Sequence, residues 1–211
     1  MRILVIGASQ GTGALAVEEA LARGHDVTAF ARSPEKLAVA SQRLTRTKGD
    51  FHDPLSVRAA IKGHDAVIVT ASATSLKGFK ENPSYFSQGT RHVIDAMRAE
   101  GVRRLVILSA LGVGESRPLA NFLVDKLLIS FLLKVPFEDH ERQEAMVRES
   151  GLEWVIARPG RLTNGAAQRR YLKKTAIEKV PSSISRADVA AFLVDAAEND
   201  AWVRKAVQLG G

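Results

Sequence analysis

A glycine-rich loop near the start of the chain limits its possible folds more than any other sequence feature. Residues 2–6 form a short apolar run rich in β-branched side chains, which predicts a buried strand. Residues 14–23 have apolar side chains at helical spacing, and Gly24 ends this pattern as a helix C-cap. The loop between them has the sequence Gly7-Ala8-Ser9-Gln10-Gly11-Thr12-Gly13. A strand, a glycine loop and a helix in this order are typical of the first βα unit of a dinucleotide-binding domain.

Each glycine in the loop has its own physical role. Gly7 permits the tight turn that leaves the strand, Gly11 lets the backbone approach a pyrophosphate without a Cβ in the way, and Gly13 lets the helix pack closely on the sheet. The free N–H groups and the positive dipole at the helix start then hold the phosphates. Three further side chains offer hydrogen-bond donors: Ser9, Gln10 and Thr12. We predict dinucleotide binding here, and the alternative is a turn that serves only chain geometry.

Strand and helix patterns alternate along the rest of the chain. Strands are expected at 26–31, 66–70, 104–109, 154–158 and 206–209, with a weaker candidate at 45–49, and helices at about 54–62, 84–100, 118–133, 138–149 and 186–197. Helix starts are indicated by Ser33-Pro34, Asp53-Pro54 and Asn82-Pro83. This alternation predicts an α/β fold: a single Rossmann-like, doubly wound parallel sheet with helices on both faces. We expect one NAD(P)-binding domain over residues 1–211, with its substrate pocket at the C-terminal edge of the sheet.

The end of the second predicted strand indicates which dinucleotide binds. A protein that selects NAD usually places Asp or Glu there, to bind the ribose 2′-hydroxyl. Here the strand ends Phe30-Ala31-Arg32-Ser33, without a carboxylate. Arg32 offers a planar cation and Ser33 a hydroxyl to a 2′-phosphate, and Lys36 lies one helical turn further on. These residues predict NADP(H) as the cofactor, and the alternative is a solvated loop arginine.

Residues that follow the other strands complete the expected cofactor site, because ligands of such sheets bind at the carboxyl ends of the strands. Asp50 and Phe51 are expected beside the adenine, and Ala71 and Ser72 on the ribose or nicotinamide side. Ser109 ends the fifth strand and is a candidate to bind the nicotinamide carboxamide or to take part in catalysis. The alternative for Ser109 is a structural hydroxyl at a strand end.

Composition excludes several kinds of chemistry. The chain contains no cysteine, which excludes disulfides, thiolate catalysis and iron–sulfur clusters. Its five histidines have no metal-motif spacing, so we expect no metal site. The net charge of +7 favours anionic partners, but the basic run 169–174 lacks a wider basic face, so we expect no nucleic-acid partner.

Targeting and membrane signals are weak. The apolar run at the start is too short for a signal peptide, which makes a cytoplasmic protein the default expectation. The most apolar segment, 119–135, is interrupted by charges and is shorter than a membrane span, so we expect no membrane partner. It is consistent with a buried helix, a wall of the substrate pocket or a self-association face. We expect a monomer or a homodimer.

The usual acid of short-chain carbonyl reductases is missing. Those enzymes use a Tyr-x-x-x-Lys pair, whereas Tyr85 is followed at this spacing by Gly89, and Tyr171 by Thr175. Hydride transfer to an acceptor that needs no strong protein acid is therefore favoured, such as a flavin, a quinone or an extended conjugated ring. His140 is a candidate proton relay, because its reference pKa lies near neutrality, and the alternative is a solvated histidine.

Several short stretches together resemble the atypical short-chain dehydrogenase/reductase group of small NAD(P)H-binding proteins, and within it the biliverdin IXβ and flavin reductases. They are 7–13, 32–36, 49–50, 63–69, 89–101, 101–109, 139–142, 148–152, 158–160 and 184–189. The resemblance implies a Rossmann fold, NAD(P)H-dependent reduction and a carboxamide held by the backbone of Pro159 and Gly160.

Three positions depart from the pattern of these relatives. Gln10 stands where a middle glycine is usual, with Gly11 next to it, and Ser109-Ala110 keeps one hydroxyl of a pair. Arg161 replaces the histidine of the biliverdin reductases. The last two departures together weigh against bilin reduction more than against flavin reduction. Arg161 or Arg158 is a candidate to bind an anionic group of a small-molecule substrate, and surface ion pairs are the alternative.

Three functions follow in order of preference. The first is an NADPH-dependent reductase of conjugated acceptors. The second is an NADP(H)-sensing regulatory protein, similar to the NmrA-like regulators, with little or no turnover. A sugar-nucleotide epimerase or dehydratase ranks third, because those relatives keep the Tyr-Lys pair and a larger C-terminal region.

Overall fold

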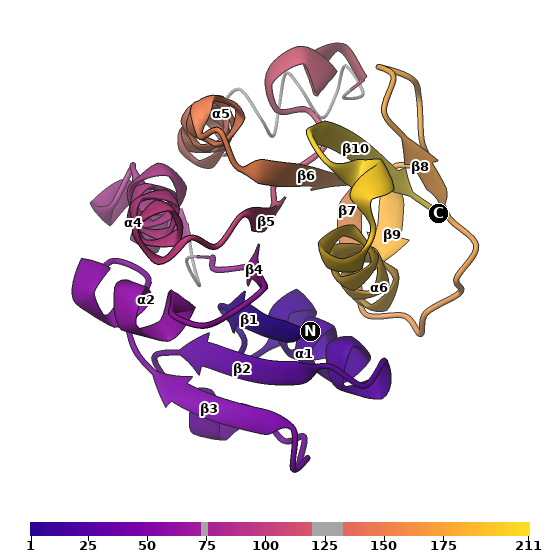
Figure 1. Cartoon of the computed structure of the whole chain (residues 1–211). Helices are drawn as coiled ribbons and strands as arrows, with labels where there is room; N and C mark the ends of the chain where they lie inside the picture. Colours follow the sequence, from indigo (N-terminus) through magenta and orange to yellow (C-terminus); the bar gives the residue numbers. More distant parts are fainter. Residues whose placement is uncertain (73–75, 120–132) are drawn as a thin grey trace.

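A central sheet with helices on both faces forms the framework of the molecule (Figure 1). The computed structural model describes residues 1–72, 76–119 and 133–211. Within them, eight strands form one sheet in the order β3-β2-β1-β4-β5-β6-β10-β8. These strands are β1 (Arg2–Ile6), β2 (Asp26–Ala31), β3 (Leu44–Lys48), β4 (Ala66–Val69), β5 (Arg104–Leu108), β6 (Glu153–Pro159), β8 (Leu172–Lys174) and β10 (Lys205–Gly210). A second, two-stranded sheet pairs β7 (Arg161–Thr163) with β9 (Ser183–Ser185).

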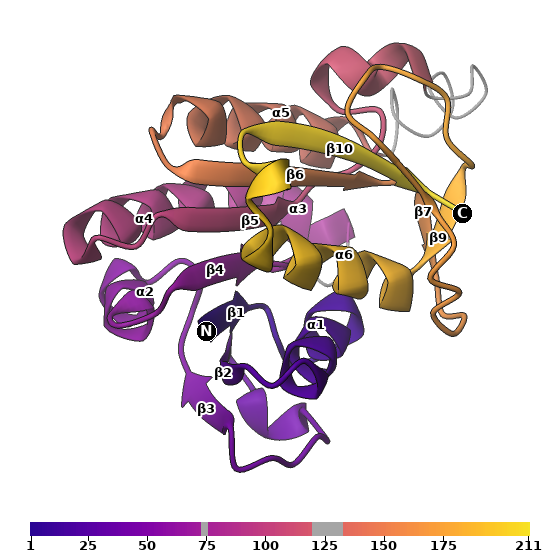
Figure 2. The same cartoon turned by 45° about the vertical axis from the view of Figure 1, so that its right-hand side comes forward.

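The helices divide between the two faces of the sheet, as Figures 1 and 2 show. They are α1 (Gly11–Ala22), α2 (Pro54–Ile61), α3 (Leu76–Glu81), α4 (Tyr85–Glu100), α5 (Lys134–Glu149) and α6 (Arg186–Glu198). Helices α1 and α6 lie side by side on one face, and α2, α4 and α5 lie on the other. Among the described residues, no helix is long and apolar enough to cross a membrane.

The strand order reverses beside β1. Strand β1 is parallel to β2 on one side and to β4 on the other, and the chain continues outward in both directions. This is the doubly wound arrangement, in which ligands bind at the switch point between the two halves. The predicted fold class is confirmed, because the six strands β3-β2-β1-β4-β5-β6 run parallel in this order.

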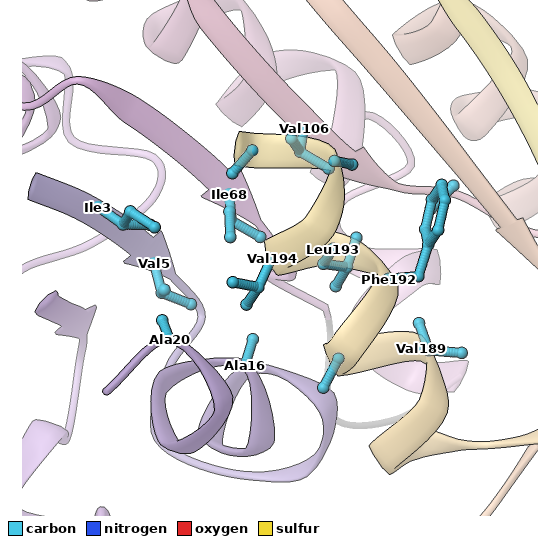
Figure 3. Close-up of a cluster of buried hydrophobic side chains, with 14 of the residues drawn as sticks. Ile3, Val5, Ala16, Ala20, Ile68, Val106, Val189, Phe192, Leu193 and Val194 are labelled. Atoms are coloured by element: carbon cyan, nitrogen blue, oxygen red, sulfur yellow. The ribbon is translucent and has the colours of Figure 1, made fainter. Parts of the chain in front are cut away.

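Alternating side chains of the buried strands form two separate apolar cores. In β1, Ile3 and Val5 belong to the core under α1 and α6, whereas Leu4 and Ile6 belong to the core under α2, α4 and α5. Figure 3 shows the first of these cores. Because successive strand residues point to opposite faces, a continuously apolar run fits a strand that is covered on both sides.

Three predictions about elements are corrected, and a fourth falls mostly outside the described residues. The strand β8 pairs antiparallel with β10, so the sheet is not wholly parallel; three-residue strands have no readable periodicity. The expected helix at Ser33 is a 3-10 turn, Pro34–Lys36, because the next residue, Leu37, turns back to bury its side chain. Helix α4 starts at Tyr85, after a turn in which Asn82 Oδ1 accepts from the N–H of Ser84. Of the helix expected at 118–133, residues 120–132 lie outside the described part, and a 3-10 helix ends at Leu119.

Candidate functional site

The glycine loop has the backbone conformations that a dinucleotide requires. Gly7 has φ +87°, and a Cβ there would lie 2.6 Å from the backbone of Ala71 in the neighbouring strand end. A Cβ on Gly13 would lie 2.2 Å from the carbonyl oxygen of Gly7, so helix and strand approach each other only through glycine. Gly11 has φ +60° and faces open space, with Arg186 Nε as its nearest neighbour at 3.9 Å from the Cβ position. These three geometries agree with the role expected of each glycine.

Two cavities meet over this loop and together form a continuous cleft along the carboxyl ends of the strands. They share Gly7, Ser9, Gln10 and Ala71. We call the first the adenosine-end cavity; its other lining residues are Ile6, Phe30, Ala31, Arg32, Ser33, Lys36, Gly49, Asp50, Phe51 and Tyr85. The second, of about 440 Å³, is the nicotinamide-end cavity; it is also lined by Gly11, Thr12, Gly13, Thr70, Ser72, Phe86, Leu108, Ser109, His140, Leu162 and Arg186.

The adenosine-end cavity gathers all the residues predicted to select the dinucleotide. Arg32 and Ser33 follow β2, and Lys36 closes the 3-10 turn after them. No carboxylate of the described residues lies within 4 Å of the Arg32 guanidinium, which leaves its charge for a ligand. Asp50 instead uses its carboxylate to accept from the N–H of His52 at 2.9 Å, and Phe51 lies beside it with a buried ring.

Helix α4 supplies the wall between the two cavities. The buried Asp139 of α5 caps the first turn of α4, because its Oδ2 accepts from the N–H of Phe86 at 2.6 Å. This cap fixes the Phe86 ring against the imidazole of His140, with centroids 3.8 Å apart and planes at 19°. Both stacked rings line the nicotinamide-end cavity.

Burial and hydrogen bonding determine the charge state of His140. Its Nδ1 lies 2.8 Å from Oε1 of Gln143, whose Nε2 donates to Thr90 Oγ1 at 2.8 Å. Gln143 Oε1 is therefore the acceptor, so Nδ1 carries the proton and Nε2 is the basic nitrogen. Burial lowers the pKa of His140 and outweighs the opposing effects of Gln143, Glu144 and Asp139. The imidazole is neutral at physiological pH, and the alternative of a solvated histidine is wrong.

Ser109 belongs to a buried network that begins at the cleft. Its Oγ donates to Oε1 of Glu144 at 2.6 Å. Glu144 also accepts from Nε of Arg158 at 2.9 Å, and Arg158 Nη2 donates to Glu115 at 2.9 Å nearer the surface. Burial favours the neutral form of Arg158, but Glu144 and Glu115 outweigh it and raise its pKa. Arg158 is 0% exposed. The two roles that the sequence suggested for it, a substrate contact and a surface ion pair, are therefore both wrong.

The network fixes what Ser109 can offer a ligand. Its proton points to Glu144, so its oxygen lone pairs are what it can offer to a ligand in the cleft. Such an acceptor matches the N–H₂ of a carboxamide better than it matches a carbonyl oxygen.

The cleft contains a polar atom that lacks a partner. Thr12 Oγ1, at the first turn of α1, is buried and has no hydrogen-bond partner among the described residues. An unsatisfied buried hydroxyl costs about 1–3 kcal/mol. A phosphate oxygen placed over the loop would accept from it, so the residues present fit a dinucleotide diphosphate.

A family model described as NAD(P)H-binding matches residues 7–200 of the chain. The chain belongs to this NAD(P)H-binding family. Reductases are among the proteins that the chain resembles, as the resemblance seen in the sequence implied.

Three known proteins illustrate the relationship. Cinnamoyl-CoA reductase 1 of rice (Oryza sativa subsp. japonica) is 34% identical over 127 residues, which are 55% of this chain and 36% of that protein. The ChuY anaerobillin reductase of Escherichia coli O157:H7 is 27% identical, with a TM-score of 0.81 over 100% of this chain and 97% of its own. A short-chain dehydrogenase/reductase of Veillonella parvula, whose structure is a complex with NADP, has a TM-score of 0.82 over 100% and 94% of the two chains at 18% identity, which shows the fold alone.

Three predicted contacts of this NAD(P)H-binding protein do not line the cleft. The N–H of Gly160 donates to the carbonyl of Leu209 at 3.0 Å, and the carbonyl of Pro159 accepts from Leu111 at 2.9 Å. These groups serve the fold in place of the predicted carboxamide cradle. Arg161 is exposed on β7 and lies outside both cavities; its neighbour Leu162 lines the nicotinamide end instead.

Sequence reasoning missed several residues of the site. Glu144 lies one helical turn after His140, and this i, i+4 spacing could have placed both on one face of the helix. Arg186 follows Ser185, the N-cap of α6. Its position could have been noticed because a cation is unfavourable at the start of a helix. Phe86 and Tyr85 gave no local signal.

Proposed function

We propose that the protein is an NADPH-dependent reductase that transfers hydride to a flavin, a quinone or a related conjugated acceptor. The observation that carries this proposal is the acid–base character of the nicotinamide-end cavity. The Ser109 hydroxyl donates its hydrogen bond to Glu144, and burial keeps His140 neutral. No described residue that lines this cavity is therefore a ready acid. Conjugated rings accept hydride without one, because conjugation stabilises their reduced anions.

The two tyrosines of the chain support the same acceptor class. A catalytic tyrosine of a carbonyl reductase needs a lowered pKa. Burial raises the pKa of Tyr85, which lines the adenosine-end cavity, and raises that of Tyr171 to about 12. Neither tyrosine lines the nicotinamide-end cavity. An isolated ketone would lack a proton donor at its oxygen.

Binding and orientation are the tasks of this chain's own residues, because the bound coenzyme supplies the hydride. Arg32, Ser33 and Lys36 line one cavity and could together bind a 2′-phosphate, which supports the choice of NADPH in this proposal. Ser109 accepts from the carboxamide and fixes the rotation of the nicotinamide ring. The stacked rings of Phe86 and His140 would give the acceptor an aromatic wall. Hydride adds two electrons and one proton to the acceptor, and a second proton comes from water.

An acceptor screen tests the proposal. The purified protein is mixed with NADPH and, in separate reactions, FMN, a soluble naphthoquinone, biliverdin and a set of simple ketones and aldehydes. Biliverdin is included because ChuY is named an anaerobillin reductase. We expect NADPH oxidation with at least one conjugated acceptor and rates at least about 100-fold lower with isolated carbonyls, since general acid catalysis contributes roughly 10²–10⁴-fold.

Two outcomes would contradict the proposal. Comparable rates with simple ketones would show that an acid is present after all. Tight NADPH binding by calorimetry without turnover of any acceptor would favour the sensing function instead.

A further inference from the structure

Arg186 is placed where the C-terminal half of the chain approaches the glycine loop. It is the first residue of α6, and α6 lies beside α1 with both helices starting at the carboxyl edge of the sheet (Figure 2). Arg186 Nε lies 3.9 Å from the Cβ position of Gly11. Gly11 is the glycine at which the backbone approaches the diphosphate. The guanidinium group therefore lies next to the loop backbone, at the same cavity that Gly11 lines.

A hydrogen bond to a neighbouring segment orients this side chain. Arg186 Nη1 donates to Asn164 Oδ1 at 2.7 Å. The segment that carries Asn164 is tied down at Asp188, whose buried carboxylate accepts from the N–H groups of Gln168 at 3.1 Å and Arg169 at 2.8 Å. The Arg169 guanidinium in turn pairs with Glu19 of α1. Asn164 thus orients Arg186, and the segment that follows Asn164 is anchored to both helices.

The charge of Arg186 is not used within the described part of the chain. No carboxylate there lies within 4 Å of its guanidinium, whereas Arg158 and Arg169 each have an acidic partner. A cation in the first turn of a helix also opposes the helix dipole. An anion between Arg186 and the start of α1 would compensate both the charge and the dipoles.

We propose that Arg186 binds the diphosphate of the coenzyme, at the phosphate on the nicotinamide side. The side is given by the cavities, because Arg186 lines the nicotinamide end and does not line the adenosine end. The loop backbone and the neighbouring guanidinium would hold the diphosphate together. Arg186 would thereby bind NADPH and NADH alike, while Arg32 distinguishes them. This inference rests on the coenzyme site of the proposed function and not on the acceptor.

Calorimetry with four ligands tests the assignment. NADPH, NADH and ADP-ribose contain the diphosphate, whereas adenosine 2′,5′-bisphosphate lacks the phosphate on the nicotinamide side. For Arg186→Met we expect Kd to rise about 10- to 100-fold for the first three ligands, as for loss of a charged hydrogen bond, and less than about threefold for the bisphosphate. Arg170→Met is the matched control: it removes one charge from an exposed residue of the neighbouring segment that lines neither cavity, and should change each Kd less than about threefold.

The results that overturn the inference are distinct from failure of the proposed function. An unchanged Kd for NADH and ADP-ribose in Arg186→Met overturns it, even if the wild-type protein reduces acceptors. An effect on the KM of the acceptor alone would assign Arg186 to the acceptor instead, which also overturns it. If Arg186→Met does not fold, Asn164→Leu releases the guanidinium while keeping its charge, and a smaller rise in Kd for the same three ligands is expected. No rise with that variant counts against the inference.

Discussion

Ser109 Oγ donates a hydrogen bond to Glu144 Oε1 at 2.6 Å, and both side chains are buried at the floor of the nicotinamide-end cavity. The contact joins the end of β5 to the middle of α5, and Arg158 of β6 holds the same carboxylate from the other side. A hydroxyl whose proton is fixed in this way is a positioned acceptor. Its ligand role and its structural role can be separated by mutation.

Ser109→Ala removes the acceptor and leaves Glu144 paired with Arg158. We expect the Kd of NADPH to rise about 2- to 10-fold, because one neutral hydrogen bond contributes about 0.5–1.5 kcal/mol. Coenzyme titration by fluorescence measures this. Ser150→Ala is the control, since Ser150 is also buried but its Oγ donates to Val147 at the end of α5, outside both cavities. Equal effects of the two variants on Kd would assign Ser109 a purely structural role.

Glu144→Gln tests the charge balance of the network. The change leaves the fully buried Arg158 with only the half-exposed Glu115 as its carboxylate partner. Removing one partner of a buried ion pair costs about 3–5 kcal/mol, and we expect a loss of about 3 kcal/mol in the free energy of unfolding, measured in urea. Adding Arg158→Met should recover part of this loss, because the uncompensated charge is then gone. A double variant as unstable as the sum of the two single losses would contradict this account.

Gly11→Ala should separate folding from coenzyme binding. At its φ of +60°, any residue with a Cβ costs about 1–2 kcal/mol. The added Cβ would meet no backbone atom within 4 Å. The methyl group would occupy the space that a diphosphate needs, so we expect the Kd of NADPH to rise at least about tenfold. Gly101→Ala is the matched control, with φ +71°, open space and a position at the far end of α4. Stability should fall similarly in both variants, and a similar fall in coenzyme affinity would contradict the prediction.

Local signals in the sequence predicted the framework of the cleft. The glycine loop, the strand ends at Arg32 and Ser109, and the helix cap at Asp53 each depend on neighbouring residues, and Asp53 Oδ1 does accept from the N–H of Leu55 at 3.0 Å. Apolar periodicity likewise located every strand of the parallel part of the sheet within two residues.

Contacts between distant segments could not be predicted in the same way. Glu144 and Arg158 look like ordinary polar residues until β6 and α5 are packed together, and a buried pair leaves no pattern in the sequence. Arg186 reaches a loop that is about 175 residues earlier in the chain, so only the topology shows that they meet. The surroundings of His140 also depend on Phe86 from another helix, and this explains why its burial was missed.

Buried histidines predict the pH dependence of stability. Burial lowers the pKa of His52, His64 and His140 in the folded protein. Below about pH 6.5 the unfolded chain binds protons that the folded chain does not, so the free energy of unfolding falls as the pH falls. Each histidine that binds a proton only in the unfolded chain changes the free energy of unfolding by up to about 1.4 kcal/mol per pH unit.

Urea unfolding between pH 7.5 and 5.5 measures this effect. Glu19 and Glu115 do not interfere in that window: burial opposes their ionisation, but their arginine partners outweigh it and keep both pKa values below the usual range. His140→Gln should lose stability at pH 7.5 and show a shallower decline on acidification. An unchanged slope would mean that His140 is protonated in the folded state.

Arg32→Ala should change the choice of coenzyme. Arg32 follows β2 and lines the adenosine-end cavity, where no described carboxylate pairs with it and no Asp or Glu stands in its place. Loss of a charged hydrogen bond of about 1.5–3 kcal/mol predicts a rise in the Kd of NADPH by about 10- to 100-fold. The Kd of NADH should change less than about threefold, because NADH has no 2′-phosphate. Lys36→Ala should have the same selectivity with a smaller effect.

The control for this prediction is Arg103→Ala. It removes an exposed arginine just before β5, at the opposite edge of the sheet, and breaks only a surface ion pair with Glu153. The Kd of NADPH and that of NADH should both stay unchanged, since charges separated by more than about 10 Å are screened at ordinary salt. If Arg32→Ala weakens the binding of NADH as much as that of NADPH, the guanidinium contacts another part of the adenosine. A preference for NADPH must then arise elsewhere in the cavity.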